Sequence, residues 1–321
     1  MSNIQIQPSL SVIVVTWNGK RYALECLESL RKAAIELPFE VIVVDNASAD
    51  GTPDAIQAQF PHVNLVRNAA NVGFAKANNI GIRLSTGRHL CLVNSDVVVP
   101  PGCLEKLVDF MEKNPSVGVL GPKMLSPTGE VGYSVMRLPT VWNSFCCAIG
   151  LHALLPAAKW FGGFQMNAYP YNAVDDVEVL TGWFWMISRR ALEGVGGLDE
   201  RFFMYGEDID WCYRFRHAGW RVVFYPFAEA LHYGAASSGK TPIRFYIEMH
   251  RANLQYFRKH HGRVGSLGYG MVMWLHHSCR ATAYSLIFLT SSRNRTEAAF
   301  KVKRSVLCLA GLAGLTRRSR A

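Results

Sequence analysis

Asp96 is the residue of this sequence that most clearly requires a binding partner, because its carboxylate lies within an otherwise apolar stretch, residues 90–99. Asn94, Ser95 and Asp96 interrupt that stretch, and apolar residues resume directly after them. Burying a carboxylate costs free energy unless it is paired, hydrogen-bonded or bound to a metal ion. In an open α/β sheet, ligands bind at the carboxyl ends of the strands. We therefore expect a strand that ends by presenting Asp96 to a partner.

Other polar residues follow apolar runs in the same way. Each one alone is a weak signal, since Asp and Asn are ordinary turn residues. Together they predict one polar rim along the carboxyl edge of a sheet, which is the layout of a nucleotide-sugar site. Besides Asp96, the rim contains Thr16, Asn18, Asp45, Glu207 and Asp208.

The elements that must position this rim follow from periodicity. Continuous apolar runs rich in β-branched residues predict buried parallel strands at 10–16, 40–45, 62–67 and 90–99. Helical spacing predicts helices at 20–34, from Thr52 with Thr52 as N-cap, and at 75–84. Strands that alternate with helices predict a parallel, wound α/β sheet.

The second half of the chain is less regular. A helix is expected after Pro100 and Pro101, and a strand at 117–125. Residues 126–176 are predicted to form loops that shape a pocket or a membrane-facing flap. A strand at 177–187, a helix opening at Glu207 and short strands at 220–225 and 228–232 follow, and from about 241 the chain is predicted to be helical and amphipathic.

The composition limits the class of protein, the kinds of partner and the cellular location that are possible. The chain has 321 residues, half of them hydrophobic, which excludes a largely disordered protein. Its net charge is +10, and many late cations alternate with Leu-rich stretches, which favours an anionic membrane surface over nucleic acid. Eight cysteines without a CxxC pair indicate a reducing cytosol. Without an export signal or an apolar run of about 20 residues, we expect a cytoplasmic, peripheral membrane protein.

Five motifs, in this order, resemble the inverting family 2 glycosyltransferases, close to their bacterial rhamnosyltransferase branch. They are VIVVTWN, VIVVDNASADGT, NVGFAKANNIG, CLVNSD and FFMYGEDIDWCYR. The resemblance covers residues 9–240 and implies a catalytic domain there with a GT-A nucleotide-sugar-binding fold, a mostly parallel wound sheet flanked by helices. Alternating apolar and basic residues predict a C-terminal helical, amphipathic extension at 241–321 that associates with a membrane. The alternative is that these helices pack on the catalytic domain or on another subunit.

The resemblance implies that Asp45 hydrogen-bonds the nucleotide base. The alternatives are an ordinary turn or cap for Asp45, Asn71 and Asn79, and a core position for Trp183, which is otherwise expected to stack on a sugar. Residues near the base, or in the turn and helix that close the nucleotide pocket, are Thr16, Asn18, Asn46, Asn71, Gly73, Lys76 and Asn79.

Asn94-Ser95-Asp96 matches the place of the family's DxD triplet, which holds a divalent ion on the donor diphosphate. Hard oxygen ligands suit Mg²⁺ or Mn²⁺, and the alternative for Asp96 is a structural carboxylate with satisfied hydrogen bonds. Asn94 replaces the first carboxylate, so metal binding is expected to be modest and donor-dependent, and Asn94 serves either the metal or the ribose. His232 matches a position that completes the metal site in some relatives, with a buried, hydrogen-bonded histidine as the alternative.

Glu207 and Asp208 resemble the family's ED motif, whose Asp acts as general base. We assign the base to Asp208 and acceptor binding or support to Glu207, with exchanged roles as the alternative. At a helix start, the positive end of the dipole favours an ionised carboxylate. Asp210 and Arg214, four residues apart, predict an ion pair on the helix surface.

The predicted function is inverting transfer of a sugar, L-rhamnose from dTDP-rhamnose, to a lipid-linked or polysaccharide acceptor in cell-envelope glycan synthesis. It is placed at the cytoplasmic face of the inner membrane. Two alternatives remain: the same chemistry with a UDP-hexose donor, and a non-catalytic nucleotide-sugar-binding subunit. Ser237, Ser238 and Lys240 are further candidates for diphosphate contacts.

Overall fold

The computed structural model describes residues 8–33, 38–154, 160–161, 166, 169–234, 242–290 and 294–314. The chain divides into two units. Unit 1 comprises residues 1–137, 169–203 and 207–237, and unit 2 comprises residues 138–168, 204–206 and 238–321. The predicted division at residue 240 stays a prediction.

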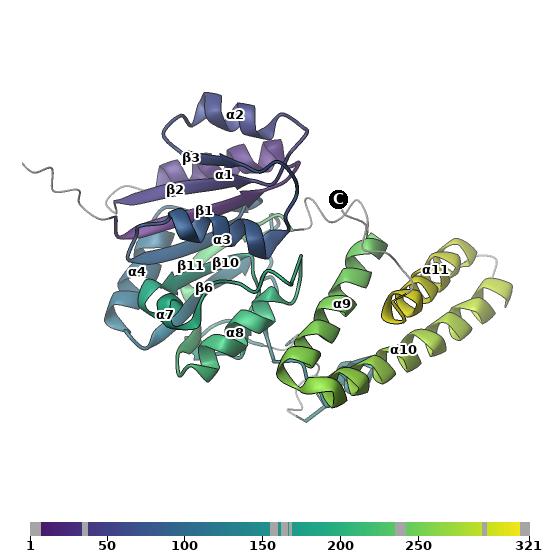
Figure 1. Cartoon of the computed structure of the whole chain (residues 1–321). Helices are drawn as coiled ribbons and strands as arrows, with labels where there is room; N and C mark the ends of the chain where they lie inside the picture. The colour runs from purple at the N-terminus through teal and green to yellow at the C-terminus, as the bar shows by residue number, and fades with distance from the viewer. Residues whose placement is uncertain are drawn as a thin grey trace, which may run out of the picture. The chain divides into compact units, whose positions relative to one another are not determined.

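Unit 1 is built on one mixed sheet with the order β3-β2-β1-β4-β10-β6-β11-β5, and β8 pairs with β11. The strands β3, β2 and β1 lie side by side (Figure 1). Four neighbouring strands are parallel, as predicted from their apolar runs. They are β1 (Leu10–Thr16), β2 (Phe39–Asp45), β3 (Asn64–Arg67) and β4 (His89–Asn94). Their alternation with helices confirms the expected α/β class.

The other half of the sheet departs from a simple parallel order. β10 (Phe184–Ser188) runs antiparallel to both β4 and β6 (Val117–Leu125). β11 (Arg221–His232) is parallel to β6 and contains a register shift between Tyr225 and Glu229. The two short strands predicted at 220–225 and 228–232 are therefore one strand with an irregularity, because the bulge interrupts its alternation without ending it.

The predicted strand 90–99 is also wrong as a single element. β4 ends at Asn94, and Val97–Val98 forms a separate strand, β5, that pairs antiparallel with β11. The polar triplet therefore turns the chain from the centre of the sheet to its last strand. The stretch 177–187 is likewise divided, into β9 (Val179–Leu180) and β10.

Helices of unit 1 bury one apolar face each against the sheet or against each other. In α1, for example, the inward face consists of Ala23, Cys26, Leu27 and Leu30 at helical spacing. The helices are α1 (Lys20–Ala33), α2 (Thr52–Gln59), α3 (Phe74–Leu84), α4 (Cys103–Lys113), α7 (Arg189–Val195) and α8 (Glu207–His217).

The predicted cap of α2 is wrong by one residue. Gly51, at φ 77°, is the N-cap, and no side chain caps the helix. Thr52 is already helical, and its hydroxyl donates to the Asp50 carboxylate instead of accepting from the helix. Pro53 lies in the first turn, as predicted.

Residues 126–176 contain more structure than the loops predicted for them. The largest element is α5 (Val141–Ala148), which begins with a reciprocal capping box between Thr140 and Asn143. Asn stands where Glu or Gln is usual in this motif, so the sequence pattern does not indicate a helix start there. The other elements there are β7 (Val135–Met136), paired with β9, α6 (Leu151–Leu154) and β8 (Asp175–Asp176).

Unit 2 is helical in its described residues, as expected for the end of the chain. α9 (Pro242–His260), α10 (Gly262–Thr290) and α11 (Arg295–Leu312) pack on one another (Figure 1). α10 also packs on α5. Tyr256, Phe257 and Tyr269 form part of their buried interface. None of the described helices combines the length and the apolar character that crossing a membrane requires.

Candidate active site

Strand register places the predicted rim residues at one edge of the sheet. Thr16, the last residue of β1, is opposite Asp45, the last residue of β2. Asn94, the last residue of β4, is opposite Val15 on the other side of β1. Three neighbouring parallel strands thus end within one residue of each other and present polar side chains together.

Asp45 and Thr16 both carry buried polar atoms at this edge. One Asp45 oxygen, Oδ2, accepts a hydrogen bond from the backbone N–H of Ser48 at 3.0 Å. The other, Oδ1, and the hydroxyl of Thr16 are buried without a hydrogen-bond partner among the described residues. An unsatisfied buried polar atom costs about 1–3 kcal/mol, so these two atoms are suited to receive a polar ligand.

Asn18 links the loops that follow β1 and β2. Its side-chain oxygen accepts from the Ala49 N–H at 2.8 Å, and its backbone N–H donates to Ser48 Oγ at 2.9 Å. Asn18 and Ala47 both have left-handed backbones, at φ 50° and 63°. Such conformations are uncommon outside glycine and persist only where surrounding contacts enforce them. Asn18 therefore shapes the loop that carries Ser48.

Asn46 braces the turn before α3. Its side-chain N–H donates to Asn71 Oδ1 at 2.9 Å, and its Oδ1 accepts from the Val72 N–H at 3.0 Å. Gly73, at φ 88°, ends the turn, and a Cβ there would lie 2.6 Å from the carbonyl oxygen of Phe203. Only glycine fits this approach, so the predicted pocket residues Asn46, Asn71 and Gly73 fix the backbone here.

Asn79 and Lys76 lie on α3 in different surroundings. The buried Asn79 amide donates to the Leu198 carbonyl at 2.8 Å and to Glu200 at 3.1 Å, and it accepts from the Leu198 N–H at 2.9 Å. Asn79 therefore holds the loop after α7, while Lys76 is exposed.

Asp96 and His232, 136 residues apart, are brought together by the pairing of β5 with β11. Asp96 Oδ1 lies 3.1 Å from His232 Nε2, and both side chains are mostly buried. The backbone carbonyl of Asp96 also accepts from the Tyr233 N–H at 3.0 Å. Two ligands on adjacent positions of an octahedral ion at about 2.1 Å would be about 3 Å apart, so the pair fits a divalent cation.

Trp183 contacts both His232 and Asn94, the last residue of β4. Its ring stacks on the His232 imidazole with a centroid distance of 5.5 Å and an interplanar angle of 25°. Its backbone carbonyl accepts from the Asn94 N–H at 2.9 Å. Contrary to the sequence pattern, Trp183 precedes β10, whereas Trp185 lies within it and packs on Trp211. Stacking of a sugar on Trp183 stays a prediction.

Glu207 and Asp208 open α8, as predicted from the ED motif. Glu207 is only 6% exposed, and its Oε2 has no hydrogen-bond partner among the described residues. Burial, reinforced by the neighbouring Asp208 charge, raises the pKa of Glu207 well above its usual value. Burial therefore has a larger effect on the pKa of Glu207 than the helix dipole has, and the neutral acid is favoured at this position. Asp208 is less buried, and its Oδ1 accepts from the Ile209 N–H at 2.8 Å.

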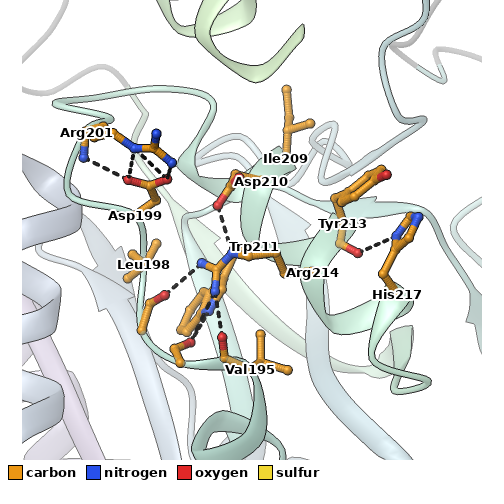
Figure 2. A network of polar contacts seen from close by, with 12 residues as sticks. Val195, Leu198, Asp199, Arg201, Ile209, Asp210, Trp211, Tyr213, Arg214 and His217 are labelled. Atoms are coloured by element: carbon orange, nitrogen blue, oxygen red, sulfur yellow. Dashed lines mark hydrogen bonds and ion pairs between the residues drawn. The ribbon is translucent and has the colours of Figure 1, made fainter. Parts of the chain in front are cut away.

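The Asp210–Arg214 pair exists but is not on the surface, in contrast to the prediction. Asp210 is fully buried, and Arg214 Nε donates to it at 2.9 Å. The same guanidinium donates to the carbonyls of Val195 at 2.9 Å and Gly197 at 2.7 Å (Figure 2). The loop after α7 covers this face of α8, and helical spacing alone does not reveal that cover.

Ser237, Ser238 and Lys240 lie outside the described residues. Ser95 is half-buried in the turn between β4 and β5.

Tyr233 belongs to none of the motifs, yet it makes two contacts beside the site. Its hydroxyl donates to the Glu25 carboxylate at 2.6 Å, and its ring packs against the Tyr22 ring with a centroid distance of 5.0 Å. Tyr233 therefore ties the residue next to His232 to α1.

Comparisons with known proteins show the family of the chain. The family model for glycosyl transferase family 2 matches residues 11–196. An N-acetylglucosaminyl-diphospho-decaprenol L-rhamnosyltransferase of Mycobacterium tuberculosis is 32% identical over 267 residues, covering 78% of this chain and 85% of the relative. The low-salt glycan biosynthesis hexosyltransferase Agl10 of Haloferax volcanii is 25% identical over 227 residues, covering 70% of this chain and 66% of the relative.

Among solved structures, a mannosyltransferase from Pyrobaculum calidifontis in complex with GDP-Man and Mn²⁺ aligns with a TM-score of 0.57 at 18% identity. The alignment covers 97% of this chain and 88% of that one. This likeness supports the GT-A fold. The family model spans more than half of the chain, and a relative above 30% identity spans most of it. The chain therefore belongs to glycosyl transferase family 2 and is a glycosyltransferase.

Proposed function

We propose that this enzyme transfers L-rhamnose from dTDP-rhamnose, with inversion, to a lipid-linked or polysaccharide acceptor of the cell envelope. The observation that carries the proposal is the 32% identity, over most of both chains, to an enzyme named as an L-rhamnosyltransferase acting on a diphospho-decaprenol acceptor. The arrangement of the rim residues supports the same chemistry.

The nucleotide is assigned to the edge formed by β1 and β2. Asp45 Oδ1 accepts from the base and the Thr16 hydroxyl contacts the nucleoside, which would satisfy the two unpartnered buried atoms. Asn18, Asn46, Asn71 and Gly73 hold the surrounding loops in shape through the contacts described above.

Asp208 is assigned as the general base. An inverting transfer requires a carboxylate to take the proton of the acceptor hydroxyl as the new glycosidic bond forms and the nucleoside diphosphate leaves. A base must be ionised, and the neighbouring Glu207 is the acid whose pKa is raised. We therefore give Glu207 a hydrogen bond to the acceptor and Asp208 the proton transfer.

The residues that would hold Mg²⁺ or Mn²⁺ are Asp96 and His232, with Asn94 and Ser95 beside the donor. The ion, when bound, offsets negative charge on the diphosphate of the leaving nucleotide. Trp183 keeps the His232 ring in place by stacking on it. Because Asp96 is the single carboxylate of the triplet, the site binds the ion well only together with the donor.

Unit 2 is assigned to the membrane surface. Along α10, large apolar side chains are exposed at helical spacing, namely Val264, Leu267, Met271, Trp274 and Leu275. Three of them, Leu267, Met271 and Trp274, also line a groove of about 630 Å³, together with the polar residues Gln255, Arg258 and Ser266. Residues 241–321 contain 14 of the 34 Lys and Arg residues and 2 of the 24 Asp and Glu residues. An apolar face beside basic residues suits anionic lipid headgroups, at the cytoplasmic face of the inner membrane.

A panel of nucleotide sugars, tested by thermal shift with and without Mn²⁺, addresses the donor. Ligands that bind the folded state raise the melting temperature according to their affinity. We expect dTDP-rhamnose with Mn²⁺ to give the largest increase and Asp96→Asn to remove the Mn²⁺-dependent part. A larger increase with a UDP-hexose would replace the donor assignment. Donor binding without transfer to any polyprenyl-diphosphate sugar would exclude the lipid-linked acceptor.

A further inference from the structure

Three residues with metal-binding side chains meet inside unit 2. They are His250 on α9, His277 on α10 and Cys308 on α11, and all three are buried. One potential ligand atom from each lies within 4.8 Å of the other two. The three helices that supply them are the long helices of the C-terminal region (Figure 1). Three such side chains together are unusual in a buried helix interface. Buried polar atoms require hydrogen-bond partners or a metal ion, and apolar neighbours supply neither.

The two imidazoles contact each other through one nitrogen of each ring. His250 Nε2 lies 3.0 Å from His277 Nε2, and the two rings are nearly perpendicular, at 87°. Two imidazoles on a tetrahedral zinc ion, with Zn–N of about 2.0–2.1 Å, have their nitrogens about 3.3 Å apart. The Cys308 Sγ lies within 4.8 Å of a nitrogen of each imidazole. A nitrogen and a thiolate on one zinc ion are about 3.6 Å apart, with Zn–S of about 2.3 Å, so binding requires the cluster to contract around the ion.

A second layer of contacts orients the first histidine. His250 Nδ1 lies 3.0 Å from Tyr269 Oη, which accepts from Asn253 Nδ2 at 3.1 Å. In the tautomer with the proton on Nδ1, which donates to Tyr269, His250 presents the lone pair of Nε2 to the cluster, and zinc binding would select this tautomer. Metal-ligating histidines are commonly fixed in this way by their other nitrogen. Tyr269 and Asn253 are themselves buried, so the arrangement is held by packing.

The protonation states also suit a metal. Burial lowers the pKa of His250 to about 4 and of His277 to about 3, so both are neutral near pH 7. Burial raises the pKa of the Cys308 thiol to about 11, while the nearby Arg304 acts in the opposite direction. A binding ion would displace the thiol proton to solvent and form a metal–thiolate bond.

We propose that His250, His277 and Cys308 bind one zinc ion that links α9, α10 and α11. A thiolate with two imidazoles selects Zn²⁺ over the hard ions Mg²⁺ and Mn²⁺. Three protein ligands leave the fourth tetrahedral position to a small ligand such as water. The site is separate from Asp96 and His232, which belong to unit 1, and does not depend on the donor assigned to the enzyme.

The test uses the full chain, stripped with a chelator and then titrated with Zn²⁺ or Co²⁺. We expect one equivalent of zinc to remain after gel filtration and the cobalt form to show a thiolate-to-cobalt charge-transfer band. Cys308→Ser should remove that band and weaken zinc binding at least about tenfold. Cys279→Ser, an exposed cysteine on α10, is the matched control and should behave as the wild type.

Two further variants keep the result interpretable. Tyr269→Phe removes only the partner of His250 Nδ1 and should weaken zinc binding about tenfold, which tests the site even where Cys308→Ser does not fold. Asp96→Asn should retain the zinc equivalent, which separates this site from the catalytic metal. Absence of a bound equivalent, a cobalt form without the thiolate band, or Cys308→Ser and Tyr269→Phe binding as the wild type would overturn the proposal.

Discussion

The two units of the enzyme bury polar atoms in different places. In unit 1, Thr16 and Asp45 lie at the carboxyl ends of neighbouring strands, where the sheet is open to a ligand. In unit 2, His250 and His277 face each other inside a helix interface. The first arrangement suits a substrate that enters and leaves with each turnover. The second suits a component that stays bound for the lifetime of the fold.

Their surfaces differ as well. Large exposed apolar side chains are concentrated in unit 2, where α10 alone presents Leu267, Met271 and Trp274 among others. In the part of unit 1 that the structure describes, such residues are fewer and scattered, Leu84 and Phe227 among them. Scattered apolar residues are normal on a protein surface, whereas a contiguous patch marks an interaction site. Chemistry and attachment are therefore expected to respond to different substitutions.

The largest effect is expected at the proposed base. Asp208→Asn should reduce the transfer rate by about 10²–10⁴, because the acceptor proton loses its carboxylate. Donor binding and membrane association should change little. Radiolabelled sugar transfer to a polyprenyl-diphosphate sugar measures the effect, with Asp109→Asn, an exposed carboxylate on α4, as control. Activity within a few-fold of wild type would remove Asp208 from the base role.

The next effect concerns the buried ion pair of unit 1. Arg214→Met removes the guanidinium that lies 2.9 Å from the fully buried Asp210 carboxylate and should lower the free energy of unfolding by about 3–5 kcal/mol. Lys113→Met, from the exposed pair with Asp109, should cost at most about 1 kcal/mol. Urea unfolding followed by tryptophan fluorescence compares them. Equal losses would mean that burial does not distinguish the two pairs.

A smaller loss is expected at the turn before α3. Gly73→Ala places a Cβ against the Phe203 carbonyl in addition to the strain of a positive φ, whereas Gly102→Ala, at φ 81°, meets open space. We expect Gly73→Ala to be about 1–3 kcal/mol more destabilising than Gly102→Ala and to weaken donor binding. Parallel denaturation and donor titrations check this. Similar values for both variants would contradict a tight approach.

Replacing Glu207 with Gln should raise the free energy of unfolding by an amount that depends on pH. Its folded-state pKa lies above the ordinary value of 4.5, so the folded protein binds the extra proton and loses stability as pH rises above 4.5. Glu207→Gln cannot ionise and should be more stable near pH 7, where each tenfold difference in proton affinity between the folded and unfolded states is worth about 1.4 kcal/mol. The gain should vanish below pH 4.5. Melting curves across pH test this, and a pH-independent difference would contradict it.

The smallest effect is expected on the surface of unit 2. Arg258→Gln removes one cation beside the apolar groove and should weaken binding to anionic vesicles about fivefold, in line with about 1 kcal/mol per surface cation. Arg83→Gln, an exposed arginine of unit 1, is the control. Sedimentation with vesicles at two salt concentrations measures both. Equal responses would place the membrane contact outside unit 2.

Much of unit 1 could be predicted because its strands are continuous apolar runs. Parallel neighbours must end at the same edge, so Thr16, Asp45 and Asn94 were predicted to lie together, and the register places them there. The juxtaposition of Asp96 and His232 was suggested only by the family resemblance. It depends on β5 pairing with β11, and no local pattern specifies a partner 136 residues away.

Three errors have local physical causes. The short strand β5 was merged with β4 because apolar residues continue through the turn at Ser95 and Asp96. The start of α5 was missed because Asn143 takes the usual place of Glu in its capping box. Asp210 was expected at the surface because its helix position says nothing about the loop that covers it. The cluster in unit 2 carried no recognisable spacing, since its members come from three separate helices.

The wide separation of Asp96 and His232 also affects the order of assembly. The two side chains meet only when β11, which ends at residue 232, has joined the sheet. Pairings between distant segments form late, because closing the intervening chain costs entropy first. During synthesis, which proceeds from the N-terminus, a chain that ends before residue 221 contains the whole parallel half of the sheet but not this imidazole. The Asp96–His232 contact thus reports that the sheet is complete.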